Sequence, residues 1–293
     1  MKKLRITNLS KNYGNNIALS NFDLTIKSGE IVGLIGRNGA GKTTLLNCIA
    51  GNIFSDNGQI IYDNQNILHN SELRMKFGVL IEPSFLEYMN CYDNLKLLMI
   101  ASGVSDKAII DAKISQVLEI VGLNTRKKDY VKKFSFGMKQ RMGFAQTLLE
   151  EREMLFLDEP FVGLDINGRQ IMKNYLRKLA YEKGVGILFS DHNLDEVNDL
   201  CHRVVAIQNG EKIYDGLVMD DIEYEIKIGE VKIELSNVMS QFANIKFIKE
   251  ERKVILSKSD ELNNVIRVIM KYTTIENIRT KENALEILLK EGN

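Results

Sequence analysis

The chain has 293 residues, of which 44% are hydrophobic and only two are proline, which excludes a disordered chain and indicates a globular protein with a sizeable core. Thirty-nine Lys and Arg residues balance thirty-nine Asp and Glu residues, so the net charge is zero. This balance excludes a global field that would attract nucleic acid or an anionic membrane, and any such contact must be local.

The first predicted elements are two strands at residues 4–9 and 22–27, where apolar and polar residues alternate. Tyr13 lies between them, and its ring either stacks on a purine base or packs against the protein; the residue type alone leaves both interpretations open. Residues 31–35 follow a turn and form a short apolar run rich in β-branched residues, which predicts a buried parallel strand.

A glycine-rich stretch follows this strand and opens a helix. It reads G-x-x-x-x-G-K-T from Gly36 to Thr43, and the helical composition after it ends at Gly51, a typical C-cap. Backbone N–H groups and the helix dipole converge on one anion in this context, which predicts a site for a nucleoside triphosphate. Lys42 would supply charge for the β- and γ-phosphates, and the Thr43 hydroxyl can enter a magnesium shell. The expected binding residues are Gly36, Arg37, Asn38, Gly39, Ala40, Gly41, Lys42, Thr43 and Thr44.

A short strand at 59–62 lies between turn signals, and a buried strand at 77–81 ends at Glu82. From about residue 84 to 150 the pattern is helical, which predicts a helical insert. Within it, Ser135 is the expected N-cap of a helix. The Ser135 hydroxyl, the Gly137 N–H and the helix N-terminus together form a second anion site. Because the chain already has a phosphate site, we expect this one to serve the nucleotide of another subunit.

Core-type strands return at 154–157, 186–189 and 204–207, separated by helical patterns at 167–183 and 193–200, which predicts a parallel α/β sheet. The strand at 154–157 ends in Asp158 and Glu159, where a doubly wound sheet places its ligand crevice. We expect Asp158 to hold magnesium, directly or through water. We expect Glu159 to polarise a water that attacks the γ-phosphate, because phosphoryl transfer needs an oriented nucleophile.

The pattern changes beyond Gly216. Alternating segments at 231–235, 245–248 and 254–256 are followed by an amphipathic stretch at 260–271, a strand-like stretch at 274–279 and a final helix at 281–290. These elements suffice for a small α+β domain, so we expect an ATPase domain at 1–217 and an accessory domain at 218–293. The accessory domain carries no catalytic pattern, and a dimer contact or a regulatory function is a hypothesis for it.

The sequence predicts a cytosolic chain. No stretch reaches the ~18 apolar residues of a membrane span, and polar residues interrupt the start before a signal-peptide core could form. Cys48, Cys91 and Cys201 are far apart and lack C-x-x-C spacing, so we expect reduced, buried thiols rather than disulfides or a zinc site.

The order and spacing of these motifs resemble the ATPase subunits of ABC transporters over residues 1 to about 217. The resemblance implies a P-loop NTPase with a RecA-like core, an antiparallel β subdomain and the helical insert. It implies that Tyr13 stacks on adenine, that Asp165 is the D-loop aspartate, and that His192 is the switch histidine that senses the γ-phosphate. It also implies that two copies sandwich two ATP molecules with Mg²⁺ in a head-to-tail homodimer. The signature residues that would act on the partner's nucleotide are Ser135, Phe136, Gly137, Met138, Lys139 and Gln140.

Two positions depart from the common family pattern. Phe136 occupies a signature position where the family more often has glycine, and Glu82 stands where it usually has the Q-loop glutamine. A carboxylate at position 82 adds negative charge beside the triphosphate. This charge is favourable only if the carboxylate also binds magnesium or a basic group of a partner. Glu82 is either a neutral substitution or a group that couples the site to a membrane subunit. This glutamate and the Met-Lys-Gln-Arg ending of the signature are similar to exporters for bacitracin resistance and lantibiotic self-protection.

We therefore expect the cytosolic ATPase of an exporter, held at the inner face of the membrane by a separate permease subunit, with no nucleic-acid partner. The main alternative is an ABC-type ATPase that acts on ribosomes or DNA, although such proteins normally carry two cassettes or a long coiled-coil insert. Other exporter cargoes, such as a lipid, a polysaccharide or an ion, remain open. A nucleotide-binding scaffold without turnover conflicts with the presence of both Asp158 and Glu159.

Overall fold

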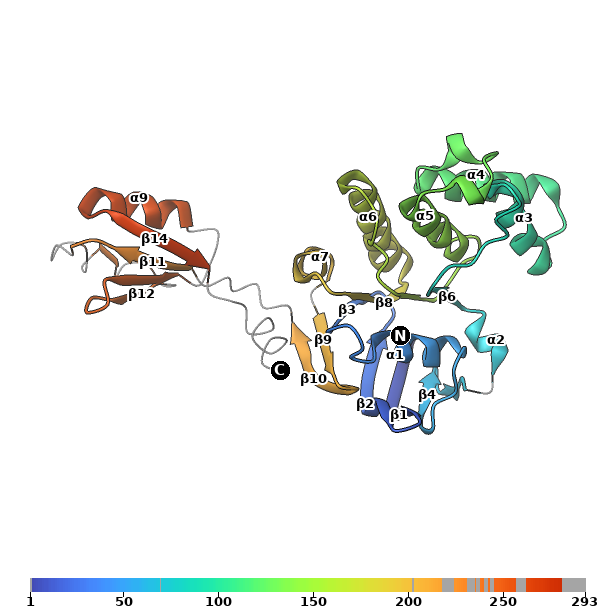
Figure 1. Cartoon of the computed structure of the whole chain (residues 1–293), viewed down its shortest axis with the longest axis horizontal. Coiled ribbons are helices and arrows are strands. Elements are labelled where there is room, and N and C mark those ends of the chain that lie inside the picture. The colour runs from blue at the N-terminus through green and yellow to red at the C-terminus, as the bar shows by residue number, and fades with distance from the viewer. Residues whose placement is uncertain are drawn as a thin grey trace. The chain divides into compact units, whose positions relative to one another are not determined.

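The structure is a computed structural model that describes residues 2–68, 70–201, 203–217, 224–230, 235, 238–239, 242, 245–256 and 262–280. The chain divides into two compact units, Met1–Leu217 (unit 1) and Val218–Asn293 (unit 2) (Figure 1). Residues 231–234 of one expected strand and the final helix expected at 281–290 lie outside the described residues.

Unit 1 begins with a four-stranded antiparallel sheet in the order β2-β1-β4-β5. Its strands are β1 (Lys3–Tyr13), β2 (Asn16–Lys27), β4 (Asn57–Tyr62) and β5 (Gln65–Asn66). The first two strands form a hairpin, so they extend beyond the expected ranges of 4–9 and 22–27 as far as Tyr13 and Asn16. Asp63 and Asn64, both with positive φ, join β4 to β5 as the turn signal predicted.

The second sheet of unit 1 has six strands in the order β10-β9-β3-β8-β7-β6. They are β3 (Ile31–Ile35), β6 (Phe77–Leu80), β7 (Met154–Leu157), β8 (Gly186–Asp191), β9 (Arg203–Gln208) and β10 (Glu211–Leu217). Strands β9, β3, β8, β7 and β6 pair in parallel, and β10, which the sequence did not predict, is antiparallel at the edge. Every residue of β3, β7 and β8 is buried, as continuous apolar runs predict.

The helices of unit 1 are α1 (Lys42–Ala50), α2 (Ser71–Arg74), α3 (Cys91–Ala101), α4 (Lys107–Ile120), α5 (Phe136–Thr147), α6 (Ile166–Lys183) and α7 (Leu194–Leu200), with 3-10 turns at Asn124–Arg126 and Val131–Lys133. Helices α3, α4 and α5 lie together beyond the β6 edge of the sheet and form the expected helical insert (Figure 1). Ser135 caps α5 as predicted, because its Oγ accepts the N–H of Met138 at 3.3 Å.

The core of unit 1 joins the two sheets. Tyr62 of the antiparallel sheet meets Phe77 of β6 edge to face, with ring centroids 5.1 Å apart, and Phe77 meets Phe156 of β7 at 5.2 Å. All three rings are buried. This packing fixes the antiparallel sheet against β6 and β7 of the parallel sheet. The predicted site residues lie at the carboxyl ends of the parallel strands.

Unit 2 combines a sheet with helical segments, as predicted for an α+β domain. The strands β11 (Tyr224–Ile228), β12 (Ile245–Ile248), β13 (Lys253–Leu256) and β14 (Ile275–Thr280) lie in the order β12-β13-β11-β14, with antiparallel neighbours. Helical backbone occurs at 235 and 238–239 and in α9 (Leu262–Tyr272). This order is that of a split β-α-β (ferredoxin-like) arrangement. Ile226 and Val254 of the sheet form a core with Val265 and Ile269 of α9.

The cysteine prediction is confirmed, because Cys48, Cys91 and Cys201 are all buried and free. Burial raises the pKa of Cys48 to about 11 and that of Cys91 and Cys201 to about 12, so the thiols stay protonated near neutral pH. None of the described helices combines the length and the hydropathy that a membrane span requires.

Candidate active site

The glycine loop connects β3 to α1 and leaves no room for side chains at two positions. A Cβ on Gly36 would collide with the carbonyl oxygen of Ile207, and a Cβ on Gly41 would collide with that of Ala18. Gly41 also has φ 112°, a conformation that favours glycine. The loop is therefore fixed by its own backbone against the strands on both sides.

Lys42 is buried within this loop. Its Nζ donates to the carbonyl oxygens of Gly36 at 2.6 Å and Arg37 at 3.1 Å, which fold the side chain back along the loop. Burial lowers the pKa of Lys42, although the carboxylates of Glu159, Asp158 and Asp191 oppose this shift. The ammonium group thus lies in the field of the acidic residues at the ends of β7 and β8.

Asp158 follows β7 and is held by two hydroxyl groups. Thr43 Oγ1 donates to Asp158 Oδ2 at 2.6 Å, and Ser190 Oγ donates to Asp158 Oδ1. Ser190 Oγ also accepts the N–H of Glu159 at 2.9 Å. The structure therefore brings the first residues of α1 and the ends of β7 and β8 together at one point.

Glu159 has an unusual backbone conformation, with φ 43°. A non-glycine residue in this region costs about 1 kcal/mol or more, and it persists only where neighbours hold it. Ser190 binds its N–H, and Gln140 Nε2 of α5 donates to its carbonyl oxygen at 3.2 Å. These contacts hold the backbone of Glu159 on both sides of its side chain.

His192 lies beside Glu159. Its Nδ1 is 3.5 Å from Glu159 Oε1 and 3.8 Å from Asp191 Oδ1, and its side chain is 59% exposed. Asp191 is buried, which raises its pKa, and it accepts the N–H of Asn193 at 2.8 Å. The loop of residues 191–193 (the histidine segment) thus presents an exposed imidazole next to a partly buried carboxylate.

Tyr13 ends β1 and is 47% exposed, with Lys11 Nζ 5.7 Å from its ring centroid. This exposure contradicts the interpretation of Tyr13 as a core side chain, and stacking on a base stays a prediction.

The predicted signature residues form the tip of α5, which touches the turn before α6. A Cβ on Gly137 would collide with the carbonyl oxygen of Gly163, and a Cβ on Gly163 would collide with the ring of Phe136, which is itself 63% exposed.

Asp165 caps α6 by accepting the N–H of Gly168 at 2.8 Å. In the described part of the chain, Ser135 Oγ contacts its own helix and not the cluster around Lys42 and Glu159. Met138 is half-buried, and Lys139 forms an ion pair with Glu87.

Glu82 follows β6, the neighbour of β7, and also has positive φ, at 46°. The N–H of Asp158 donates to Leu80 of β6 at 2.7 Å, so the ends of these two strands are in register. Glu82 is exposed at this edge.

Comparison with known proteins identifies the family. The family model for the ABC transporter matches residues 19–162. The chain is 38% identical over 210 residues to the bacitracin transport ATP-binding protein BcrA of Bacillus licheniformis, covering 71% of this chain and 67% of BcrA. It is 36% identical over 217 residues to the lantibiotic transport ATP-binding protein SrtF of Streptococcus pyogenes, covering 73% of this chain and 92% of SrtF. The chain belongs to the ABC transporter ATP-binding family.

A solved structure of an ATP-binding subunit of an ABC transporter supports the same assignment. It matches with a TM-score of 0.67 and 30% identity, over 74% of this chain and 90% of that chain. The predicted family and the P-loop fold are thereby confirmed. As an ABC ATPase, the chain binds and hydrolyses ATP.

Two contacts of this ABC ATPase site were not found from the sequence. One is the bridge through Ser190, whose only sequence signal is a polar residue at the end of the apolar run of β8. The other is the bond from Gln140 to the backbone of Glu159, which links the signature helix to the acidic strand end of the same chain. Both depend on packing between distant segments, which spacing along the sequence does not report.

Proposed function

We propose that this ABC ATPase drives the export of an antimicrobial peptide or a similar drug through a separate membrane permease. The observation that carries the proposal is the similarity to BcrA and SrtF, whose names place them in bacitracin and lantibiotic transport. Glu82 and the Met-Lys-Gln-Arg ending of the signature, which are similar to that subgroup, point in the same direction.

We assign ATP binding to the glycine loop from Gly36 to Thr44. Its backbone N–H groups and the N-terminus of α1 would hold the phosphates, with Lys42 adding charge and Tyr13 stacking on the adenine. Thr43 and Asp158 fit Mg²⁺, because both present oxygen donors and these donors already lie within 2.6 Å of one another. When bound, Mg²⁺ would neutralise charge on the β- and γ-phosphates.

Glu159 is the proposed general base. Its carboxylate would orient the water that attacks the γ-phosphate and would accept a proton from that water. Because the backbone of Glu159 is already held in place, less conformational entropy is lost when the transition state forms. His192, 3.5 Å away, would contact the γ-phosphate and hold the carboxylate in place. With this arrangement, a small displacement of the histidine segment would change the rate of ATP hydrolysis.

We propose that the working form is a homodimer. Ser135 caps an exposed helix tip that carries no acidic residue in its first turn, and this tip would meet the γ-phosphate bound to a second copy. Asp165 would lie at the same seam, next to the tip. ATP would close the dimer, the closure would act on the permease, and hydrolysis would reopen it.

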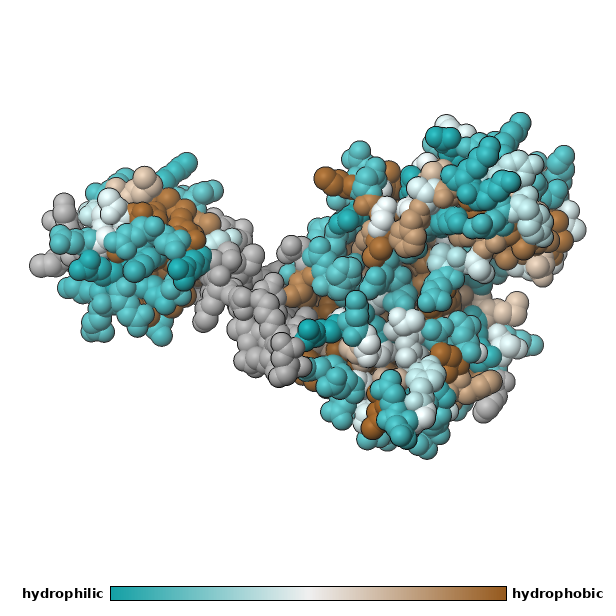
Figure 2. Space-filling model, viewed as in Figure 1, coloured by the Kyte–Doolittle hydropathy of each residue, from teal (hydrophilic) through white to brown (hydrophobic). Residues whose placement is uncertain are grey.

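The permease would hold the ATPase at the inner face of the membrane. Helix α3 exposes Leu97, Leu98 and Ile100, and Figure 2 shows hydrophobic areas over this part of unit 1. Exposed apolar groups on a helical insert suit a protein partner. Cosedimentation with membranes that contain the permease would support this location, whereas cosedimentation with ribosomes would overturn it.

The catalytic assignment is tested by Glu159→Gln. We expect the variant to bind ATP, to hydrolyse it at least about 100-fold more slowly than the wild type, and to elute as a dimer with ATP in gel filtration. Glu151→Gln is a matched control, since Glu151 is exposed before β7 and outside the site. Hydrolysis near the wild-type rate in Glu159→Gln would remove Glu159 from this function.

The cargo and Glu82 are tested in cells. Deleting the gene should increase susceptibility to particular antimicrobial peptides, and a screen of such peptides identifies the class. We propose that Glu82 couples the site to the permease, so Glu82→Gln should retain ATP binding while changing drug tolerance. An unchanged tolerance would indicate a neutral substitution.

A further inference from the structure

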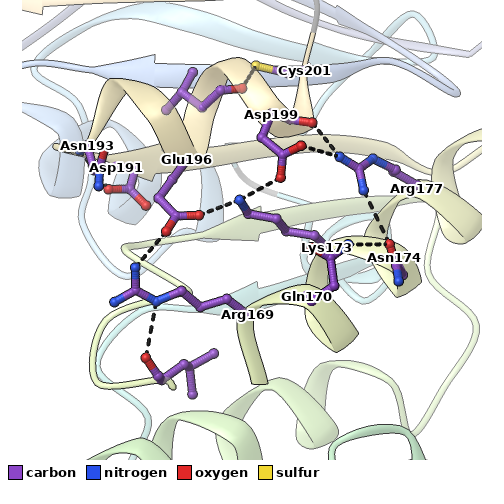
Figure 3. A network of polar contacts seen from close by, with 12 residues as sticks. Arg169, Gln170, Lys173, Asn174, Arg177, Asp191, Asn193, Glu196, Asp199 and Cys201 are labelled. Atoms are coloured by element: carbon purple, nitrogen blue, oxygen red, sulfur yellow. Dashed lines mark hydrogen bonds and ion pairs between the residues drawn. The ribbon is translucent and has the colours of Figure 1, made fainter. Parts of the chain in front are cut away.

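A row of cations on α6 meets a row of carboxylates on α7 (Figure 3). The α6 residues are spaced one helical turn apart, and the α7 carboxylates face them. We call this set the α6–α7 ladder; it consists of Arg169, Lys173 and Arg177 on α6 and Glu196 and Asp199 on α7.

Glu196 and Lys173 form the centre of the ladder, and Lys173 is buried. Arg169 Nη1 donates to Glu196 Oε1 at 2.6 Å, and Lys173 Nζ pairs with Glu196 Oε2. The side chain of Lys173 is only 7% exposed, and its Nζ also lies 2.8 Å from Asp199 Oδ2 and 5.6 Å from the ring centroid of Phe161. Glu196, whose side chain is 13% exposed, has each carboxylate oxygen in an ion pair, and this restricts the position of the carboxylate.

The two rows are attached to different parts of the proposed site. Helix α6 begins directly after Asp165, and Arg169 Nε donates to the carbonyl oxygen of Leu164 at 3.1 Å. Helix α7 begins two residues after His192. Glu196 and Arg169 line a small cavity of about 70 Å³ together with Asp191, His192 and Phe161. The ladder thus ends beside the histidine segment.

Helix α7 depends on such anchors, because it has only seven residues and a helix this short is not stable by itself. Its apolar face packs through Val197, which fits against β3 because Gly33 has no side chain there. Leu200 at the end of α7 is buried too, so apolar contacts hold the inner side of the helix. The ladder adds ion pairs from α6 to Glu196, which lies four residues after His192, and these pairs restrain the end of α7 that follows the histidine segment.

We propose that Glu196 is a positioning residue: with Lys173 and Arg169 it holds the histidine segment so that His192 stays next to Glu159. We expect Glu196 to act on the hydrolysis step rather than on ATP binding, since its ion pairs are with α6, whereas Lys42 Nζ is bonded within the glycine loop itself. This inference rests on the proposed functions of Glu159 and His192.

The test is Glu196→Gln in the full chain. Glutamine keeps the size of the side chain and one acceptor oxygen but leaves Lys173 with a weaker partner. We expect kcat for ATP hydrolysis to fall about tenfold, as displaced catalytic groups do, with the KM for ATP changed less than about twofold. Glu182→Gln is the matched control, because Glu182 is an exposed carboxylate near the end of α6 and outside the ladder; its kcat should stay near the wild-type value.

Two further measurements keep the inference falsifiable. Lys173→Met combined with Glu196→Gln should lower kcat no more than Glu196→Gln alone, because the two residues act as one unit. All rates are taken well below the unfolding midpoint of each variant. A lowered midpoint with unchanged kcat in Glu196→Gln would overturn the positioning function and leave a structural one.

His192→Ala, measured in parallel, separates this inference from the proposed function. If His192→Ala keeps its kcat, the proposed function of His192 is wrong. If His192→Ala loses activity while Glu196→Gln keeps it, the positioning inference alone is overturned.

Discussion

The glycine loop and the histidine segment follow neighbouring strands, β3 and β8, but they are fixed by different means. The loop is held by backbone contacts that tolerate no side chain at Gly36 or Gly41. The histidine segment exposes its imidazole and is tied to the body of unit 1 through charged side chains of the ladder. The difference is that the proposed phosphate-binding loop is held by its backbone, whereas the proposed γ-phosphate sensor is held by side chains that a substitution can remove.

The largest effect is expected from crowding the loop. Gly36→Ala places a Cβ against the carbonyl oxygen of Ile207, so the loop must shift, and we expect the affinity for ATP to fall about 10- to 100-fold. Equilibrium binding of a fluorescent ATP analogue measures this loss. Gly103→Ala is the control: its φ of 89° makes alanine strained there too, but a Cβ meets nothing within 4 Å and the residue lies outside the site, so the affinity for ATP should not change. Unchanged affinity in Gly36→Ala would show that the loop is not rigid.

A smaller effect is expected at the junction between the two regions. Ser190→Ala removes the hydroxyl that binds both Asp158 and the N–H of Glu159 and leaves a buried donor without its partner. We expect kcat to fall about tenfold, with a smaller change in KM. Steady-state hydrolysis measures both. Ser28→Ala, which removes a hydroxyl bonded to Lys2 far from the site, is the control. A loss of affinity with normal kcat would instead assign Ser190 to the loop.

The smallest expected effect is a change in the stability of the folded chain at low pH. Burial opposes ionisation of Glu196, but the bonds from Lys173 and Arg169 outweigh it and hold its pKa below the ordinary value of 4.5. Because the pKa of Glu196 is lower in the folded than in the unfolded protein, its ionised form adds to the free energy of unfolding above pH 4.5. This contribution is lost as the pH falls through the pKa of the folded protein. Urea unfolding should therefore show wild type more stable than Glu196→Gln at pH 7, with a difference that narrows below pH 4.5. A difference that stays constant would mean that the charge of Glu196 contributes nothing.

Short sequence patterns predicted those parts of the site that depend on neighbouring residues in the chain. The glycine loop, the Ser135 cap and the acidic end of β7 each depend on a few consecutive residues, and the structure has them at the expected positions. The ladder could not be predicted in this way. Lys173 is buried only because α7 lies over it, and the spacing of cations along α6 gives no sign of this. The positive φ of Glu82 and Glu159 was also missed, because glutamate gives no local signal for that conformation.

The contact between Gly137 and Gly163 joins the tip of α5 to the start of α6 without an intervening side chain. The carbonyl oxygen of Gly163 occupies the place that a Cβ of residue 137 would take. In the proposed homodimer, the Ser135 tip and Asp165 would therefore meet the other copy as one preformed surface. A single larger side chain at position 137 would misalign both parts of that surface at once.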